Sequence, residues 1–316
     1  MQDLFGRNIT YLRLSVTELC NLRCRYCMPA EGVQKRRHED MLTEEETVQA
    51  VQVASELGIR KVRVTGGEPL VKRNILSLCE KIATTPGIQE VCLTTNGTLL
   101  PVFATSLRDA GVKRINISLD TLDSEKYSSI TRGGKLEDAL KGLDAALNAG
   151  FDQVKINIVL IGGFNEDEIP SFVALTKRRP LDVRFIELMP MAGSSIEQER
   201  YISGNVVLTK APELIHEPEV GIVARLYRLP GALGRVGIIS PISCPFCDRC
   251  DRIRLTADGK LKPCLHKGAE FSIKGLNKED MRAQFEAAIR FKPSWHGELS
   301  PSIPSQAGRS MNRIGG

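Results

Sequence analysis

The chain has 316 residues, of which 42% are hydrophobic and 26% are charged, and its net charge is +5. These values are ordinary for a globular protein of about two domains, and they exclude a collagen-like or disordered chain. The weak positive excess suits an anionic small molecule, but it excludes the dense basic surface of a nucleic-acid-binding protein.

Short β-rich stretches alternate with helical patterns through the first part of the chain. A helix is expected after Thr43, because Thr43 and Glu46 form a capping-box pattern and Gly58 lies where the helix would end. The sequence predicts six strands and four further helices, the strands at 11–17, 61–65, 90–95, 114–120, 153–160 and 182–188 and the helices at about 73–84, 101–110, 135–149 and 166–178. This alternation predicts an α/β fold with a parallel sheet and helices outside it.

Residues with unusual chemistry gather at the carboxyl ends of the expected strands. Cys20 follows the first strand, Gly66-Gly67-Glu68-Pro69 follows the second, and Glu187 to Met189 end the sixth. Strand periodicity alone does not separate an open doubly wound sheet from a barrel. Because barrel enzymes build their sites at these strand ends, we predict a partial (βα)6 barrel of the TIM type over residues 1–195.

The alternation stops near residue 195, and we expect a smaller β-containing C-terminal domain over residues 196–316. Residues 222–240 are typical of a hairpin with a glycine-rich turn, and residues 252–266 of a second hairpin that turns at Asp258-Gly259. A helix is expected from about 277 to 291. The remaining tail is rich in Pro, Ser and Gly, and a disordered tail and a functional one both stay open.

Nine cysteines indicate metal ligands or free thiols rather than disulfides, provided that the protein stays in a reducing compartment. We expect a cytoplasmic protein with no membrane contact, because no apolar run approaches the roughly 18 residues that span a bilayer and the first residues lack a signal-peptide core. Cys79 and Cys92 lie in apolar stretches, where a thiol usually acts as a small buried hydrophobe.

Cys20, Cys24 and Cys27 form a C-x3-C-x2-C pattern within eight residues. Three thiolates are too few for a closed site with four protein ligands, but they can hold three irons of a 4Fe-4S cluster and leave the fourth iron open. A zinc site completed by a distant residue, or an electron-transfer cluster with a distant fourth cysteine, is the alternative.

A second group consists of Cys244, Cys247, Cys250 and Cys264. Spacing alone slightly favours a structural zinc site with four thiolate ligands. The alternative is another three-cysteine cluster on Cys247, Cys250 and Cys264, with Cys244 as a bystander.

The stretch RLSVTELCNLRCRYCMP at residues 13–29 resembles the signature loop of the radical S-adenosylmethionine (SAM) superfamily. This resemblance implies a partial barrel, a 4Fe-4S cluster on the first three cysteines, and SAM bound to the open iron through its amino and carboxylate groups. One electron from the cluster would then release a 5′-deoxyadenosyl radical from SAM. The SAM contacts implied in the same way are Tyr26, Gly67, Ser118 and Met189.

FCDRCDRIRLTADGKLKPCL at residues 246–265 resembles the C-terminal signature of the GTP 3′,8-cyclase family, and the resemblance continues to Gly315-Gly316, a terminal pair thought to reach the active site. It favours a second 4Fe-4S cluster over zinc, with guanine at the open iron. It implies the first step of molybdenum cofactor biosynthesis, in which the radical takes H3′ of GTP and C3′ attacks C8 to give 3′,8-cyclo-7,8-dihydro-GTP. Glu18-Leu19 departs from the family's usual Asp-Arg.

A triphosphate needs cationic partners. Arg252 and Arg254 alternate along an expected strand, so both side chains face the same side of it, beside the second cysteine group. The resemblance implies GTP contacts from Arg13, Arg63, Thr94, Lys155, Arg252 and Arg254. The residues expected to take part in catalysis are Arg13, Arg184, Arg252 and Arg254.

The resemblance also implies partners: a downstream cyclic pyranopterin monophosphate synthase, an electron donor such as flavodoxin or ferredoxin, and a second copy of the chain in a homodimer. One rival is a radical SAM enzyme that modifies a peptide and carries an auxiliary cluster, although such enzymes usually have more cysteines and lack the Arg252-Ile253-Arg254 face. The other rival is a non-catalytic metal-binding module.

Overall fold

A computed structural model describes the whole chain except residues 35, 197–199, 219–222 and 301. The strands of the described part are β1 (Tyr11–Ser15), β2 (Lys61–Thr65), β3 (Glu90–Thr95), β4 (Val112–Ser118), β5 (Gln153–Leu160), β6 (Leu181–Glu187), β7 (Ile215–Glu217), β8 (Arg225–Arg228), β9 (Val236–Ile239), β10 (Arg252–Leu255), β11 (Lys260–Lys262) and β12 (Phe271–Ser272). They form one sheet in the order β12-β11-β10-β1-β2-β3-β4-β5-β6-β9-β8-β7.

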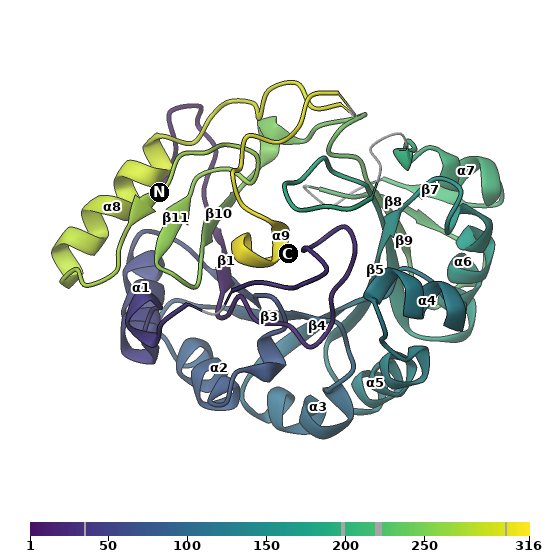
Figure 1. The fold of residues 1–316 in the computed structure, drawn as a ribbon, viewed down its shortest axis with the longest axis horizontal. Helices are drawn as coiled ribbons and strands as arrows, with labels where there is room; N and C mark the ends of the chain where they lie inside the picture. The colour runs from purple at the N-terminus through teal and green to yellow at the C-terminus, as the bar shows by residue number, and fades with distance from the viewer. Residues whose placement is uncertain (35, 197–199, 219–222, 301) are drawn as a thin grey trace.

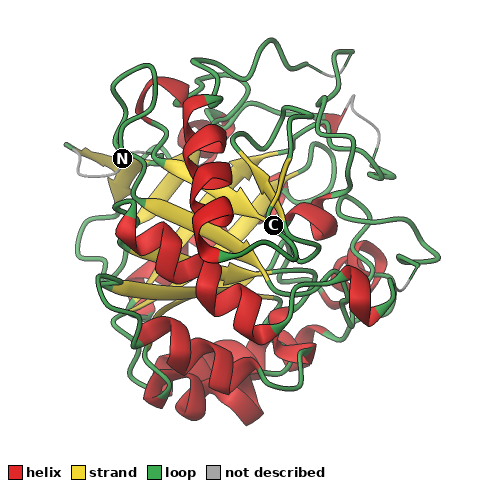
Figure 2. Cartoon of the chain, turned by 90° about the vertical axis from the view of Figure 1, so that its left-hand side faces the viewer, coloured by secondary structure: helices red, strands yellow, loops and turns green. Residues whose placement is uncertain are grey.

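The first six strands pair in parallel and in sequence order, with helices along their outer side (Figure 1). The helices are α1 (Glu44–Glu56), α2 (Ile75–Ala83), α3 (Leu100–Asp109), α4 (Ser124–Thr131), α5 (Leu136–Asn148), α6 (Ile169–Arg178), α7 (Val206–Lys210), α8 (Lys278–Arg290) and α9 (Met311–Ile314). The strands curve around a common interior that the helices enclose (Figure 2). The predicted partial (βα)6 barrel is confirmed.

Local sequence signals explain these elements. The capping box at the start of α1 is present, since Thr43 Oγ1 accepts from the Glu46 N–H at 3.1 Å and Glu46 Oε2 accepts from the Thr43 N–H at 2.8 Å. In β5, Val154, Ile156 and Ile158 are buried against the helices while the alternate side chains are half-buried on the other face. This period of two gives every barrel strand an apolar outer face and an inner face free for polar residues.

The two predicted hairpins are present, and they extend the barrel sheet at both of its edges. β8 and β9 pair antiparallel, and β9 also pairs in parallel with β6. β10 and β11 pair antiparallel, and β10 pairs in parallel with β1. The added strands satisfy backbone groups that edge strands of an open barrel would leave unpaired. The division into two domains near residue 195 stays a prediction.

Several elements and the tail differ from the sequence expectation, since α7, β7 and β12 were not predicted. The strand and helix patterns did not predict α4, which Asp123 caps by accepting from the N–H groups of Glu125 and Lys126 at 2.9 and 2.8 Å. The tail ends inside the barrel, where α9 lies near the centre of Figure 1. Ile314 is fully buried there against Met191. The disordered alternative for the end of the tail is therefore wrong.

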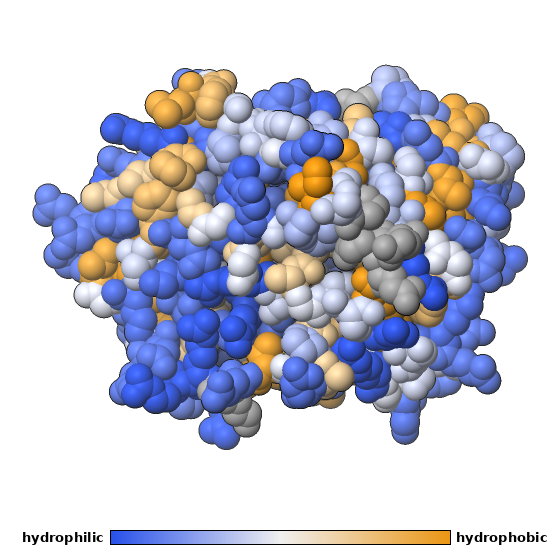
Figure 3. Space-filling view, turned by 45° about the horizontal axis from the view of Figure 1, so that its top comes forward, coloured by the Kyte–Doolittle hydropathy of each residue, from blue (hydrophilic) through white to orange (hydrophobic). Residues whose placement is uncertain are grey.

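The face of the molecule seen in Figure 3 is mostly hydrophilic, with separate apolar patches. Phe5, Val102 and Phe291 are among the large apolar side chains that are exposed. Within the described residues, no helix combines the length and the apolar character needed to cross a membrane.

Candidate active site

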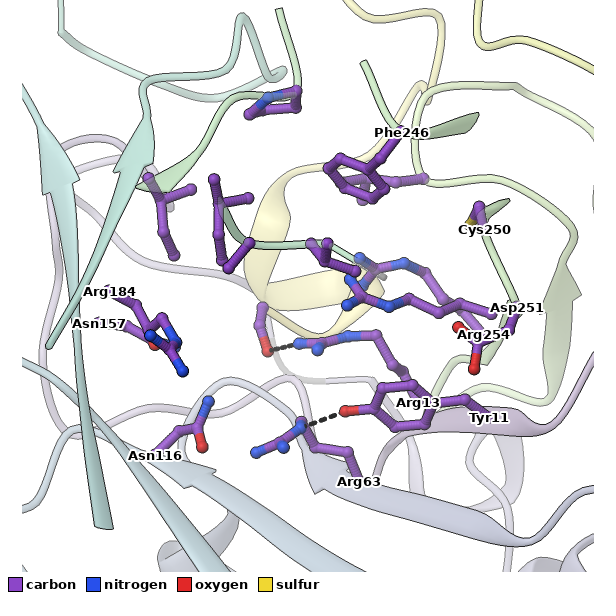
Figure 4. Close-up of a pocket in the computed structure, with 18 of the residues that line it drawn as sticks. Tyr11, Arg13, Arg63, Asn116, Asn157, Arg184, Phe246, Cys250, Asp251 and Arg254 are labelled. Carbon is purple, nitrogen blue, oxygen red and sulfur yellow. Dashed lines mark hydrogen bonds between the residues drawn. The ribbon is translucent and has the colours of Figure 1, made fainter. Parts of the chain in front are cut away.

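A cavity of about 690 Å³ lies inside the barrel, between the strands and the second cysteine group (Figure 4). Among the described residues, its wall contains ten cationic side chains and one carboxylate, Asp251. The cations are Arg13, Lys61, Arg63, Arg114, Lys155, Arg184, Arg235, Arg252, Arg254 and Lys292. Such an excess of positive charge in an enclosed space favours a ligand with several negative charges.

The strand register places several of these cations in one row. Arg254 is opposite Arg13, and Arg13 is opposite Arg63. The row continues from Arg63 to Cys92 and from Cys92 to Arg114. Because paired residues of neighbouring strands point to the same face, these side chains all face the barrel interior. The arginines therefore form a wall that a polyanion can contact along its length.

Tyr11 lies at the centre of the cations on this wall. Its hydroxyl accepts a hydrogen bond from Arg63, and the guanidinium of Arg252 lies 5.4 Å from the centre of its ring. Burial by itself would raise the pKa of Tyr11, but Arg63, Arg13 and Arg252 lower it. The phenol is therefore in direct contact with two of the guanidinium groups of this wall, those of Arg63 and Arg252.

Lys155 and Arg184 line the opposite wall (Figure 4 labels Arg184). Arg184 Nη2 donates to Asp182 at 2.9 Å, and a Cβ atom at Gly237 would lie 2.3 Å from Arg184 Nη1, so the guanidinium requires a glycine there. Burial, reinforced by Arg184, lowers the pKa of Lys155 to about 7. An anion bound between the two walls would restore the charge of Lys155.

Several guanidinium nitrogen atoms in the cavity wall are buried without a hydrogen-bond partner among the described residues. They are Arg13 Nε, Arg184 Nη1 and Arg252 Nε. Buried polar atoms in folded proteins nearly always have a partner, and an orphaned donor is costly. Phosphate oxygens would satisfy donors of this kind with charge-assisted hydrogen bonds.

Three of the four cysteines in the second group lie at the cavity, which is the division that the cluster interpretation requires. Cys247, Cys250 and Cys264 line the cavity, whereas Cys244 is exposed and is not part of the wall. In the part of the chain that the structure describes, no three His, Cys, Asp or Glu side chains are placed to hold one metal ion. Since a 4Fe-4S cluster takes each cysteine on a different iron, its ligands need not meet at one point. Three cysteines of this group therefore share the cavity wall, and the fourth lies outside it.

The first cysteine group lies in the loop after β1 and is covered by backbone and amide donors. Cys20 Sγ accepts from the Leu22 N–H at 3.4 Å and from Asn96 Nδ2 at 3.8 Å. The backbone N–H of Asn312, in α9, donates to Cys27, whose pKa burial raises to about 12. Sulfur atoms surrounded by N–H donors suit cluster-bound thiolates.

The Gly-Gly-Glu-Pro segment after β2 packs against the loop of the first cysteine group and fixes its position. A Cβ atom on Gly67 would lie 2.3 Å from the Leu19 carbonyl oxygen, so only glycine allows the two backbones to approach this closely. Glu68 is buried, and its carboxylate accepts from the Asn96 N–H at 2.7 Å and from Thr95 Oγ1 at 2.8 Å. Burial raises the pKa of Glu68 to about 7. The segment thereby connects the loop to the residues that contact Cys20.

The structure brings many of the predicted site residues together at the cavity, but not all of them. Those that line it are Arg13, Arg63, Lys155, Arg184, Met189, Arg252, Arg254, Cys247, Cys250 and Cys264. Thr94 is not among the lining residues, but its hydroxyl accepts from Arg63 at 3.5 Å. Tyr26, Gly67 and Ser118 are not part of the wall. Tyr26 is half-buried and hydrogen-bonded to Asp120, whose pKa burial raises to about 6.

The end of the chain lies between the first cysteine group and the cavity. Gly316 lines the cavity, and its carbonyl oxygen accepts from Arg13 Nη2 at 2.5 Å. Asn312 Nδ2 donates to the Glu18 carbonyl, beside the first cysteine loop, at 3.1 Å. The tail therefore connects the expected SAM region to the cationic wall.

Sequence reasoning missed several cavity residues, including Arg114, Asn116, Asn157, Arg235 and Lys292. The signal for the first three was available, because polar residues at alternate positions of β4 and β5 indicate a polar inner face. The position of Lys292 depends on where the chain returns after α8, and no local pattern indicates it.

Residues 14–176 match the Radical SAM superfamily, and residues 181–297 match the family described as Molybdenum Cofactor Synthesis C. Proteins named GTP 3′,8-cyclase from Alkaliphilus metalliredigens and Alkaliphilus oremlandii are 49% and 47% identical to this chain, and each alignment covers all of both chains. The same name belongs to a Moorella thermoacetica protein that is 44% identical over the full length of both. This chain belongs to the GTP 3′,8-cyclase family.

Solved structures agree on the fold. SuiB of Streptococcus suis superposes with a TM-score of 0.60 at 15% identity, covering 82% of this chain and 61% of SuiB. HydG, a maturase of the [FeFe]-hydrogenase, has a TM-score of 0.52 at 20% identity, covering 66% of this chain and 51% of HydG. Membership of the GTP 3′,8-cyclase family and of the radical SAM superfamily implies SAM and a 4Fe-4S cluster. The N–H donors around Cys20 and Cys27 fit such a cluster.

Proposed function

We propose that this chain is a GTP 3′,8-cyclase that uses two 4Fe-4S clusters. The observation that carries the proposal is the cavity whose wall combines a second set of three cysteines with ten cations. When bound, the first cluster and SAM would supply a 5′-deoxyadenosyl radical able to take H3′ of GTP. Attack of C3′ on C8 of guanine, followed by one-electron reduction, would give 3′,8-cyclo-7,8-dihydro-GTP.

The cysteines have distinct assignments. Cys20, Cys24 and Cys27 would hold the cluster that binds SAM, and the remaining SAM contacts would come from Tyr26, Gly67, Ser118 and Met189. Cys247, Cys250 and Cys264 would hold the second cluster, next to the guanine. Cys244 is exposed and has no part in the proposal.

The two cationic walls would bind the triphosphate. Arg13, Arg63, Arg252 and Arg254 belong to adjacent strands of one wall, so their guanidinium groups can share the phosphate oxygens. Lys155 and Arg184 would close on the ligand from the other wall, and Thr94 would orient Arg63. Bidentate guanidinium contacts would fix the orientation of the triphosphate and, through it, the position of the ribose. C3′ would then be oriented toward the radical.

An enclosed site suits radical chemistry, because solvent and stray hydrogen donors are excluded. The tail contributes to this enclosure, since Ile314 is fully buried and Gly316 lines the cavity. We propose that Gly315-Gly316 contacts the bound ligands, as residues without side chains fit a narrow space.

The reaction needs outside partners. Two electrons are required, one to cleave SAM and one to reduce the cyclised radical, and we propose a flavodoxin or ferredoxin as the donor. A cyclic pyranopterin monophosphate synthase would take up the product, and the chain would act as a homodimer. Cluster thiolates persist in a reducing compartment, so we place the reaction in the cytoplasm.

The decisive experiment is an anaerobic incubation of the reconstituted protein with dithionite, SAM and GTP. We expect 5′-deoxyadenosine and 3′,8-cyclo-7,8-dihydro-GTP, both measured by liquid chromatography and mass spectrometry. Arg252→Ala should abolish the cyclised product while the first cluster stays assembled, and Cys24→Ser should stop SAM cleavage. Absence of 5′-deoxyadenosine from the wild-type reaction would refute the proposal.

A further inference from the structure

Lys292 is a buried lysine whose contacts are all with the second cysteine region. It follows α8, and its residue is 4% exposed. Its Nζ atom donates to Cys250 Sγ at 3.4 Å, to the Arg252 carbonyl at 2.7 Å and to the Pro263 carbonyl at 2.9 Å. A lysine ammonium has three N–H donors, so these three acceptors use all of them.

The three acceptors come from two separate loops. Cys250 and Arg252 lie before and at the start of β10, whereas Pro263 directly precedes Cys264 after β11. One side chain therefore connects the loop of Cys250 to the loop of Cys264. The antiparallel pairing of β10 with β11 brings the two loops close together, and its last pair is Arg254 with Lys262. Beyond this pair, Lys292 joins the two loops and so contributes to the spacing between Cys250 and Cys264.

The charge of Lys292 needs a negative partner. No carboxylate forms an ion pair with it among the residues that the structure describes, and a buried cation without one is costly. Deprotonated cysteines would supply the missing charge, since Cys250 is within hydrogen-bond distance.

The first cysteine group has no equivalent of Lys292. The donors to Cys20 and Cys27 are the neutral amides of Leu22, Asn96 and Asn312. The side chain of Arg23 approaches the same loop, but it donates to the carbonyl of Cys20 and not to the sulfur. A charged donor to a cysteine sulfur is therefore specific, in the described part of the chain, to the second group.

We propose that Lys292 is a positioning residue for the second cluster, which holds Cys250 and Cys264 at their required spacing and raises the reduction potential of that cluster. The proposal rests on the proposed function, which places a cluster there. Hydrogen bonds to cluster sulfurs raise reduction potentials, because reduction adds negative charge that the donor stabilises. A charged donor does this more strongly than a neutral amide.

The test compares Lys292→Gln, which keeps N–H donors without the charge, with Lys292→Met, which keeps neither. The reduction potentials of both clusters are measured in the full chain by redox titration monitored by electron paramagnetic resonance. We expect the second cluster to shift to more negative potential in Lys292→Gln and further in Lys292→Met. The first cluster should keep its wild-type potential in both variants.

Lys262→Met is the matched control, because Lys262 is also a buried lysine of this region but its ammonium contacts Glu270 and the Lys267 carbonyl. It should keep both clusters and both potentials. If both Lys292 variants lose the second cluster while Lys262→Met keeps it, the result supports the role of Lys292 in holding Cys250 and Cys264 at their spacing. If Lys262→Met loses the second cluster as well, that role is refuted. Unchanged potentials in both Lys292 variants also overturn the proposal. A wild-type protein with a single cluster refutes the proposed function instead.

Discussion

Arg254 and Gly315 are joined by a buried hydrogen bond of 2.6 Å from the guanidinium Nη1 to the glycine carbonyl. This contact connects a strand beside the second cysteine group to the last turn of the chain. Burial, reinforced by Arg252, lowers the pKa of Arg254 to about 10. The tail carbonyl thus contacts an arginine that we expect to bind triphosphate, so the position of the tail and the binding of substrate are physically coupled.

Gly315→Ala should displace the tail. Gly315 has φ of +90°, and an added Cβ would lie 2.4 Å from Thr65 Oγ1 and 3.0 Å from Ser15 Cβ. Backbone strain of this kind costs about 1–3 kcal/mol, which corresponds to a decrease of roughly 5- to 150-fold in the equilibrium constant for the native tail position. We expect formation of the cyclised product, measured under anaerobic conditions, to fall accordingly.

Gly308→Ala provides the comparison for this variant. Gly308 also has positive φ, +67°, but an added Cβ would meet nothing within 4 Å. This substitution carries only the intrinsic conformational cost of about 1 kcal/mol, so activity should stay close to that of the wild type. Equal losses in the two variants would show that the contacts of Gly315 with Ser15 and Thr65 are unimportant.

Cys264→Ser and Cys244→Ser should separate the cluster ligands from the bystander. Cys264 lines the cavity and Cys244 is exposed outside it. Two complete 4Fe-4S clusters correspond to about eight irons per chain, so Cys264→Ser should lower the iron content to about four and Cys244→Ser should leave it unchanged. Metal analysis after anaerobic reconstitution measures both. A zinc atom in the wild-type protein that Cys244→Ser removes would contradict the assignment.

The sequence predicted the barrel well because its strands carry a strong local signal. β2, β3 and β5 have the predicted bounds, since each is a run of β-branched and apolar residues between turn signals. α4 was missed because its sequence, Ser124–Thr131, is rich in serine and has a weak apolar stripe. Local signals therefore predicted the helices that have a clear apolar stripe or a capping box, and they missed α4, which has neither.

The candidate site was only partly predictable, because its residues are brought together by long-range packing. The row Arg254, Arg13, Arg63 depends on the parallel pairing of β10 with β1, which joins residues about 240 positions apart. Alternation along each strand indicates which residues share a face, but not which strands are neighbours. The contact of Lys292 with Cys250 depends on the path of the chain after α8 and leaves no pattern in the sequence.

Arg309→Ala should weaken the anchoring of the tail. Arg309 Nη1 donates to Asp258 at 2.9 Å and Nη2 donates to Glu270 at 2.6 Å, and the three side chains are between 3% and 21% exposed. Removing the guanidinium leaves two partly buried carboxylates without this partner, so we expect a loss of about 1–3 kcal/mol in the free energy of unfolding. Denaturant unfolding of the anaerobic protein measures this change.

Arg282→Ala is the matched surface change. Arg282 pairs with Glu286 at 3.2 Å, but both side chains are more than a third exposed. Exposed pairs of this type contribute at most about 1 kcal/mol, and usually less. A similar loss of stability in the two variants would show that Arg309 anchors the tail no better than an ordinary surface charge.

GTP affinity should depend on pH through Lys155. Burial lowers the pKa of this lysine from 10.5 to about 7, so in the free protein the amine is increasingly neutral above pH 7. Phosphate contacts favour the ammonium, and binding above pH 7 must therefore take up a proton. We expect the dissociation constant of GTP to rise between pH 7 and 9, with a limiting slope of about tenfold per pH unit. Equilibrium binding across this range measures the slope.

Lys155→Met separates the contribution of this lysine to the pH dependence from the contributions of other titrating groups, including the phosphates of GTP itself. The variant should bind GTP more weakly below pH 7 and should lose the added slope above it. Lys61→Met should keep the slope, because Lys61 lines the same cavity from the wall of Arg63 and pairs with Glu90 at 3.0 Å. The folded state also disfavours the charged lysine, so the unliganded wild-type protein should become more stable as pH rises from about 7 toward 10.5. A Lys155→Met profile parallel to that of the wild type would mean that this lysine does not titrate on binding.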